Sequence, residues 1–163
     1  MSLNYVERHI VLVHPEIHWN TGNIGRTCVA TGTFLHLIKP LGFELSDKHV
    51  KRAGLDYWPQ VKLGIWENYA VFCAALAPQT AEVCLFTKNG ARSFRAITLL
   101  PRMFLVFGAE TKGLPHDVLQ QYPAANTFHI PMLKGTRSLN LSTSAGIALY
   151  ESLRGCDIEH AWS

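Results

Sequence analysis

The sequence lacks any long apolar run. Charged residues, Pro or Gly interrupt every hydrophobic stretch before the roughly 18–20 residues that would cross a bilayer. No basic segment followed by an apolar one opens the chain, so we predict no secretory signal and expect a cytoplasmic location. Repeats, low-complexity tracts and long Ser/Gly linkers are also missing. We therefore expect one domain over residues 1–163, with residues 1–7 as a flexible or partly cloning-derived leader.

Cysteine motifs and charge are sparse as well. None of the four cysteines forms a Cys-x-x-Cys pair, which argues against zinc ribbons and thioredoxin-type redox chemistry and favours buried free thiols. The closest histidines, His14 and His18, flank Pro15, which would disrupt a helix presenting both, so no metal site is predicted. Hydrophobic residues make up 48% and charged residues only 17%, which excludes disorder. A net charge of +3 permits nucleic-acid binding without requiring it.

Short apolar segments alternate with segments of helical character. Predicted strands cover residues 9–14, 34–38, 83–87, 103–107 and 127–130. Predicted helices start at Asn20-Thr21-Gly22 and run to Thr31, and cover residues 46–54, 66–76, 115–122 and 140–153. Strands that are apolar throughout are typical of parallel sheets covered on both faces, so the fold class is α/β, a parallel-sheet sandwich. Ligands bind such sheets beyond the carboxyl ends of the strands.

Three loops at those ends contain unusual residues. In residues 20–26 small polar residues open a helix, and Arg26 could hold a phosphate or carboxylate in a forked contact. In residues 104–115 a strand runs into a tight turn at Gly108, followed by Glu110. In residues 138–144 the hydroxyl and amide groups exceed what one helix cap needs. Each segment also has a purely structural explanation as a cap or a turn, and neither a Walker A nor a G-x-G-x-x-G phosphate loop is present.

In this order and spacing, the three segments resemble the signature motifs of the SPOUT superfamily of RNA methyltransferases, in its TrmH-like 2′-O-methylating branch. Other stretches are similar to the YibK-type TrmL group, whose members methylate the wobble-position ribose of certain leucine tRNAs; they include Pro15-Glu16-Ile17, Pro40-Leu41-Gly42-Phe43, and Lys51-Arg52-Ala53-Gly54-Leu55-Asp56-Tyr57. The resemblance covers nearly the whole chain. It implies an α/β knot with a C-terminal trefoil, S-adenosylmethionine as cofactor, tRNA as substrate, a homodimer, and no role for a metal or a membrane.

The resemblance also implies roles for individual residues. Arg26 would act on the ribose 2′-hydroxyl together with a substrate phosphate, because the pKa of a free guanidinium is too high for a base. Ser138 and Asn140 would position the ribose and the first segment, and Glu110 would tie the second segment to the first, with Asn20 as its partner. The cofactor would contact Leu85, Thr87, Gly108, Ile130, Ser138 and Leu139. The RNA-binding candidates are Lys48, Lys51, Arg52, Tyr57, Lys134, Arg137 and Tyr150.

Alternatives remain at this point. A SPOUT enzyme could act on ribosomal RNA or on another tRNA position, or the chain could be a non-catalytic RNA-binding module that kept the knot. An unrelated flavodoxin-like ligand binder is a further alternative. Residue patterns alone point to an ordinary doubly wound sheet, since true knots are nearly absent among folds.

Overall fold

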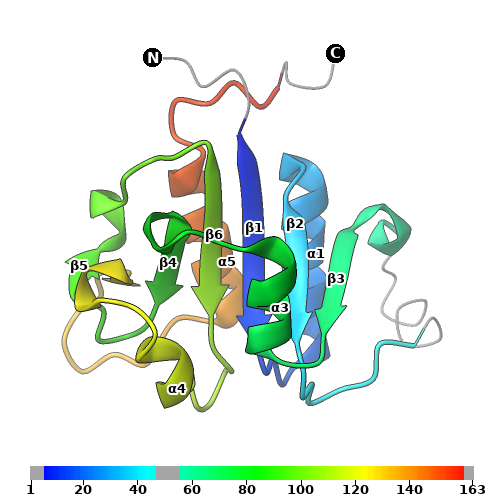
Figure 1. Cartoon of the computed structure of the whole chain (residues 1–163), viewed down its shortest axis with the longest axis horizontal. Helices are drawn as coiled ribbons and strands as arrows, with labels where there is room; N and C mark the ends of the chain where they lie inside the picture. Colours follow the sequence, from blue (N-terminus) through cyan, green and yellow to red (C-terminus); the bar gives the residue numbers. More distant parts are fainter. Residues whose placement is uncertain (1–5, 47–55, 160–163) are drawn as a thin grey trace.

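A seven-stranded, all-parallel sheet forms the centre of the molecule (Figure 1). The computed structural model describes residues 6–46 and 56–159. The strand order is β3-β2-β1-β6-β4-β7-β5. The strands are β1 (Glu7–Val13), β2 (Phe34–Ile38), β3 (Lys62–Trp66), β4 (Val83–Phe86), β5 (Arg92–Ser93), β6 (Arg102–Phe107) and β7 (Thr127–His129). The helices are α1 (His18–Thr31), α3 (Tyr69–Leu76), α4 (His116–Leu119) and α5 (Leu141–Ser152). The predicted α/β parallel-sheet class is confirmed.

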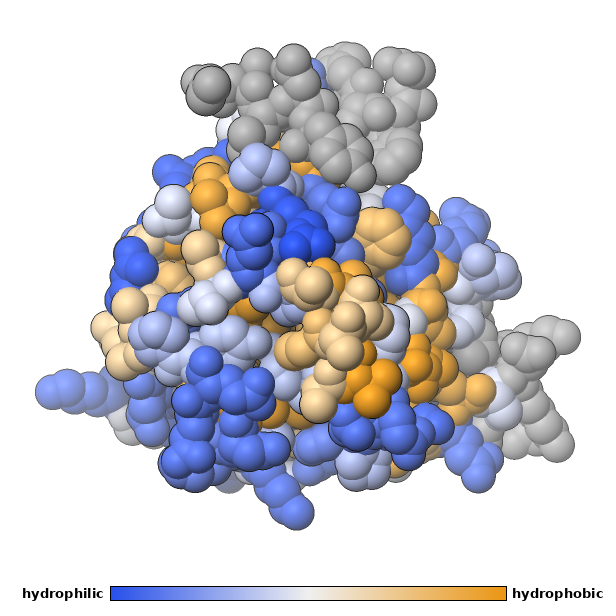
Figure 2. Space-filling view, in the orientation of Figure 1, coloured by the Kyte–Doolittle hydropathy of each residue, from blue (hydrophilic) through white to orange (hydrophobic). Residues whose placement is uncertain are grey.

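Each face of the sheet has its own apolar core, because successive strand residues point to opposite faces. In β1, Ile10 and Leu12 pack with residues of α1 and α5, whereas Val11 and Val13 pack with residues of α3 and α4. Figure 2 shows the α3 face, where apolar residues gather over α3 and hydrophilic residues gather over α4. No helix in residues 6–46 and 56–159 is long and apolar enough to span a membrane.

Several predicted elements differ from the observed ones. The strands β3 and β5 were not predicted: β3 is a partly exposed edge strand interrupted by Gly64, and β5 is only two residues long. The segment from Trp66 contributes the end of β3, and the helix α3 begins only after Asn68, whose side chain caps it. The helix α4 is one turn, shorter than predicted. The predicted basic helix over residues 46–54 lies almost entirely outside the described residues.

The ends of the chain follow the same pattern. Residues 1–5 of the expected leader lie outside the described residues, but Glu7 is already the first residue of β1. Of the four cysteines, Cys28 and Cys84 are buried, and Cys73 and Cys156 are half-buried; all four are free thiols. Burial raises the pKa of both Cys28 and Cys84 to about 12, so these thiols are protonated at neutral pH.

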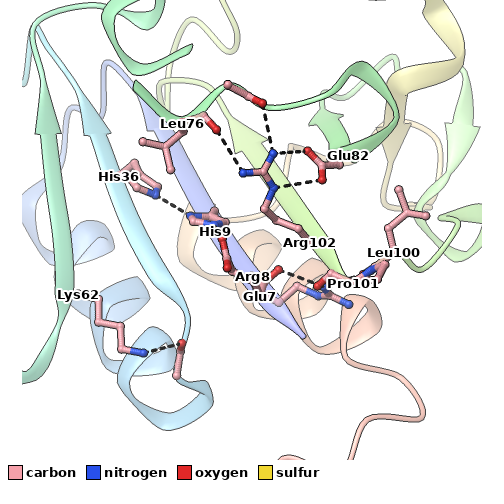
Figure 3. A network of polar contacts seen from close by, with 12 residues as sticks. Glu7, Arg8, His9, His36, Lys62, Leu76, Glu82, Leu100, Pro101 and Arg102 are labelled. Atoms are coloured by element: carbon pink, nitrogen blue, oxygen red, sulfur yellow. Dashed lines mark hydrogen bonds and ion pairs between the residues drawn. The ribbon is translucent and has the colours of Figure 1, made fainter. Parts of the chain in front are cut away.

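A buried chain of polar side chains crosses three neighbouring strands (Figure 3). Trp66 Nε1 donates to His36 Nδ1 at 3.0 Å, and His36 Nε2 lies 2.8 Å from His9 Nδ1. His9 Nε2 lies 2.7 Å from Glu7 Oε1. Both histidine side chains are fully enclosed by the sheet and α3, so the chain ties β1, β2 and β3 together by directional contacts inside an apolar layer.

A buried arginine holds the C-terminal helix against the sheet. Arg8 is only 2% exposed, and its guanidinium donates to Ser152 O at 2.7 Å and to Ser152 Oγ at 3.1 Å. It also donates to the carbonyl oxygens of Leu100 and Pro101, at 3.0 and 3.1 Å. Burial lowers the pKa of Arg8. These bonds connect the start of β1 both to the end of α5 and to the segment that enters β6.

Candidate active site

A cavity of about 540 Å³ lies at the carboxyl ends of β4, β6 and β7, where the strand topology predicts a ligand site. Its wall combines aromatic and aliphatic side chains with a few polar groups, a composition typical of small-molecule sites. The apolar lining includes Phe86, Phe107, Leu114, Phe128, Ile130, Met132 and Leu139, and the polar lining includes Asn20, Thr87, Lys88, Glu110, Thr111, Lys112, Ser138, Asn140 and Ser144.

The carboxylate of Glu110 joins the second segment to the first. Its Oε2 accepts from the backbone N–H of Glu16 at 2.7 Å, and its Oε1 accepts from the backbone N–H of Ile17 at 3.1 Å and from Asn20 Nδ2 at 3.2 Å. In return, Thr111 Oγ1 donates to the Glu16 carboxylate at 2.7 Å. Glu110 therefore supplies the negative charge at the start of α1, the position where the sequence suggested a bound phosphate or carboxylate.

This contact explains where α1 begins. The helix starts at His18, two residues before the predicted cap, and Ile17 at the N-cap offers no side-chain acceptor. Glu110 satisfies the free backbone donors instead, from a residue more than 90 positions away in sequence. Asn20, Thr21 and Gly22 lie inside the helix and are buried, so the prediction that they cap it is wrong.

Two asparagines connect the third segment to the first. Asn140 Nδ2 donates to Asn20 Oδ1 at 3.0 Å. Asn140 Oδ1 accepts from the backbone N–H of Ser142 at 2.9 Å and of Thr143 at 3.4 Å, which caps α5. Asn20 is only 3% exposed, and each polar atom of its side chain has one partner. Glu110, Asn20 and Asn140 thus form one hydrogen-bonded row that fixes three distant segments along the cavity.

The turn after β6 is fixed by close backbone packing. Ala109 and Gly113 exchange two backbone hydrogen bonds, at 3.2 and 2.9 Å, across a four-residue reversal. A Cβ atom built on Gly108 would lie 2.0 Å from the carbonyl carbon of Gly113, so only glycine fits there. Gly113 itself has a positive φ of 67°. The glycines of this segment are therefore required by the reversal that places Glu110 at the cavity.

Most of the residues expected to bind the cofactor line this cavity. Thr87, Gly108, Ile130, Ser138 and Leu139 do so, as do Glu110, Asn20 and Asn140. Leu85 does not: it is fully buried and packs in the core on the α3 side of the sheet, because it points to the opposite face from Phe86. Its assignment to the cavity is corrected on this ground.

Arg26 also lies outside the cavity. Its side chain is exposed on α1, and its guanidinium carbon lies 5.9 Å from the centre of the Tyr57 ring. The hydroxyl of Tyr57 donates to the carbonyl of Gly22 at 2.8 Å, so Tyr57 packs this part of α1. Within one chain the structure does not bring Arg26 together with Ser138 and Asn140.

The other RNA-binding candidates divide into two groups. Lys134 and Arg137 are exposed on the segment between β7 and α5, and Tyr150 is 53% exposed on α5. Lys48, Lys51 and Arg52 lie outside the described residues. The sequence analysis missed two cavity-lining lysines, Lys88 and Lys112, although both immediately follow strand ends that it had singled out.

Metal chemistry finds no donor set in the described part of the chain, where no three His, Cys, Asp or Glu side chains come together as ligands would. The cavity wall instead offers aromatic and aliphatic surfaces for a ring, with backbone and hydroxyl groups beside them.

The fold and this cavity define an α/β protein with a parallel sheet and a ligand site at the strand ends, built from three hydrogen-bonded loops. The profile of the SpoU rRNA Methylase family matches residues 7–150. The chain belongs to this family of RNA methylases.

Two curated relatives are similar over nearly their whole length. A protein of Methylovorus glucosotrophus named tRNA (cytidine(34)-2′-O)-methyltransferase is 47% identical over 152 residues, 93% of this chain and 97% of its own. A protein of the same name from Burkholderia ambifaria is 42% identical over 151 residues, with the same coverage of 93% and 97%. A solved structure described as "Structural insights into the 2-OH methylation of C/U34 on tRNA" has a TM-score of 0.83 and 45% identity, and the match covers 92% of this chain and 96% of that one.

Proposed function

We propose that this chain is an S-adenosylmethionine-dependent tRNA ribose 2′-O-methyltransferase that acts on the wobble nucleotide, a cytidine or modified uridine, of leucine tRNAs. The observation that carries the proposal is the hydrogen-bonded row of Glu110, Asn20 and Asn140, which fixes the three motif segments around one cavity. The relatives named for C34 methylation support the position of the modified nucleotide. A tRNA substrate would place the protein in the cytoplasm, and the resemblance to SPOUT enzymes carries the expectation of a trefoil knot.

The cavity fits the proposed cofactor. Its volume of about 540 Å³ lies within the roughly 300–1,000 Å³ of small-molecule sites. Ile130, Leu139 and Phe86 would contact the adenine, and Thr87, Gly108 and Ser138 would contact polar groups of the cofactor. When bound, S-adenosylmethionine supplies a methyl group on a sulfonium, which is already activated for transfer, so no metal is required.

The remaining task of the protein is to orient the ribose hydroxyl and remove its proton. Asn140 is held by Asn20 and by the start of α5, so Ser138, two residues earlier, is fixed beside the cavity. We assign Ser138 and Asn140 to positioning the ribose, and Arg26 to the hydroxyl, together with a substrate phosphate. Fixed alignment of two reactants supplies much of the rate of such a transfer, and proton removal adds roughly 10²–10⁴-fold.

The position of Arg26 favours a homodimer in which each site combines two chains. Arg26 lies outside the cavity of its own chain, so a second copy could bring it to the cavity. The helix α5 has room for such a partner at Gly146, where an added Cβ would meet nothing within 4 Å in the described chain. Small residues at a helix surface allow another backbone to approach closely.

Methyl transfer to total tRNA tests the function directly. With labelled S-adenosylmethionine, the protein should label tRNA, and nucleoside mass spectrometry should locate the 2′-O-methyl group at position 34 of leucine tRNAs. Label in ribosomal RNA or at another tRNA position would favour the alternative methylase. Binding of RNA without any transfer would favour a non-catalytic module.

Two variants test the shared site. Arg26→Ala should abolish methylation and leave cofactor binding, measured by calorimetry, unchanged. Mixing it with the inactive Asn140→Ala variant should restore up to about a quarter of the activity if subunits exchange at random and each site draws Arg26 and Asn140 from different chains. Gly146→Leu should shift the sedimentation of the protein to that of a monomer. No recovery in the exchanged mixture would contradict the shared site.

A further inference from the structure

An aromatic surface lies directly beside the cavity and has no role so far. It consists of His18 and Trp19, in the first turn of α1, and Phe43. The His18 and Trp19 ring centres are 4.5 Å apart, and the His18 and Phe43 ring centres are 6.4 Å apart. Trp19 is 64% exposed, although tryptophan is among the side chains with most apolar area to bury.

This surface contributes little to the fold. Neither Trp19 nor Phe43 is among the described residues that pack in or against the two core clusters. Tyr57 and Glu110 hold the neighbouring part of α1 through backbone groups, without using the Trp19 ring. Stability therefore does not require an indole at this position.

The surface is continuous with the cavity. Ile17 and Asn20, the residues on either side of His18 and Trp19, both line the cavity. The first turn of α1 thus presents its polar side to the cavity and its aromatic side to solvent. A ligand that extends out of the cavity on this side would meet the Trp19 ring.

The charges around the cavity indicate the chemistry of that ligand. Lys88 and Lys112 line the cavity, and Lys134 and Arg137 are exposed on the segment that leads to Ser138. The carboxylate of Glu110 is occupied by three N–H donors. Cationic groups beside exposed aromatic rings are the combination that binds single-stranded nucleic acid, through phosphates and stacked bases.

We propose that Trp19, supported by His18 and Phe43, is the stacking platform for an unpaired base next to the methylated nucleotide. The proposal rests on the proposed function, since it assumes an RNA loop with its target ribose in the cavity. Stacking recognises any base by its flat face, so Trp19 contributes affinity and position, and the identity of the base must be read elsewhere.

Kinetics of Trp19→Ala and Trp19→Phe test the platform. With the tRNA substrate, Trp19→Ala should raise KM about 5- to 150-fold, the equivalent of about 1–3 kcal/mol of stacking. Trp19→Phe should recover most of this loss, and cofactor affinity by calorimetry should not change in either variant. Val71→Ala, which shortens another exposed apolar side chain on the distant helix α3, is the matched control and should leave KM unchanged.

Abasic substitution identifies the stacked base. In anticodon stem-loops with one base removed at a time, removal at the stacked position should weaken binding to the wild-type protein. The same removal should not weaken binding to Trp19→Ala further, since the interaction is already lost. Additive losses at every position, or a wild-type KM in Trp19→Ala, would overturn the proposal.

Two outcomes separate this proposal from others. If Trp19→Ala sediments as a smaller species than the wild type, a second copy of the chain covers the surface and the platform is refuted. If the wild type methylates a different RNA, the proposed tRNA position fails, but the Trp19 variants can be measured on that RNA. Absence of any RNA binding by the wild type would refute both.

Discussion

Acid should destabilise this protein through His36, which lies in the middle of the buried polar chain across β1, β2 and β3. Because Trp66 donates to His36 Nδ1, His36 carries its proton on Nε2 and donates to His9 Nδ1. His9 then carries its proton on Nε2 and donates to Glu7. A second proton on either ring would set two N–H groups against each other, so the folded state requires both imidazoles to be neutral.

The size of the effect follows from the pKa of His36. Burial, with a smaller contribution from the neighbouring His9, lowers the pKa of His36 from 6.5 to about 3. Burial also lowers the pKa of His9, against opposing effects of the Glu7 and Glu82 carboxylates, whereas Arg102 lowers it further.

The unfolded chain binds these protons more readily than the folded protein does. The free energy of unfolding is therefore at its full value above pH 6.5, the ordinary pKa, and falls as the pH drops toward about 3. For His36 alone the loss is about 2 kcal/mol at about pH 5 and about 5 kcal/mol at about pH 3.

Urea unfolding measures this loss. The free energy of unfolding would be determined at about pH 8 and about pH 5 for the wild type, for His36→Gln and for the control His116→Gln, in which an exposed histidine is removed. The difference between the two pH values should be about 2 kcal/mol larger in the wild type and in the control than in His36→Gln. Because each protein is compared with itself, a lower stability of His36→Gln does not affect the result. Equal differences in all three proteins would refute the reasoning.

Three further changes have defined outcomes. Glu110→Gln should destabilise the protein by about 1–3 kcal/mol and reduce methylation, because an amide cannot accept all the N–H bonds that the carboxylate accepts; the exposed Glu44→Gln is the control. Gly108→Ala should cost more than about 2 kcal/mol, or prevent folding, because its Cβ would overlap the Gly113 backbone. Arg8→Met should lower the free energy of unfolding by about 3–5 kcal/mol, because buried carbonyl oxygens lose a charged donor.

Chemical denaturation and labelled methyl transfer check these predictions. Wild-type stability in Glu110→Gln would show that the loop contacts it makes are replaceable. A wild-type melting temperature in Gly108→Ala would show that the reversal relaxes easily. For Arg8→Met, an unchanged free energy of unfolding would show that water satisfies the carbonyl oxygens.

The strands that could be predicted are those whose information is local. The strands β1, β2, β4, β6 and β7 are apolar runs, and each was placed within a residue or two. The edge strand β3 could not be predicted, since its pairing with β2 is a contact across the sheet and its own pattern is polar and interrupted by glycine. Propensity is a weak signal at a sheet edge, where one side of the strand faces solvent.

The site was predicted in its residues but not in its connections. The sequence placed Glu110, Asn20 and Asn140 in loops at the same edge of a parallel sheet, because all strand ends of such a sheet meet there. The predicted contact between Glu110 and Asn20 is present at 3.2 Å. The capping of α1 by Glu110 was not predicted, since nothing near residue 17 in sequence indicates a carboxylate from residue 110.

Leu85 and Arg26 mark the limit of reasoning from the chain alone. Both belong to segments beside the cavity, but side-chain direction decides what they contact: Leu85 points into the core and Arg26 points to solvent. The sequence by itself determined the α/β class, the apolar strands, and the edge of the sheet that holds the site, since each depends on local patterning and the parallel rule. Only the tertiary structure decided which loops are bonded to one another and which side chains face the cavity, because those depend on contacts between residues about a hundred positions apart.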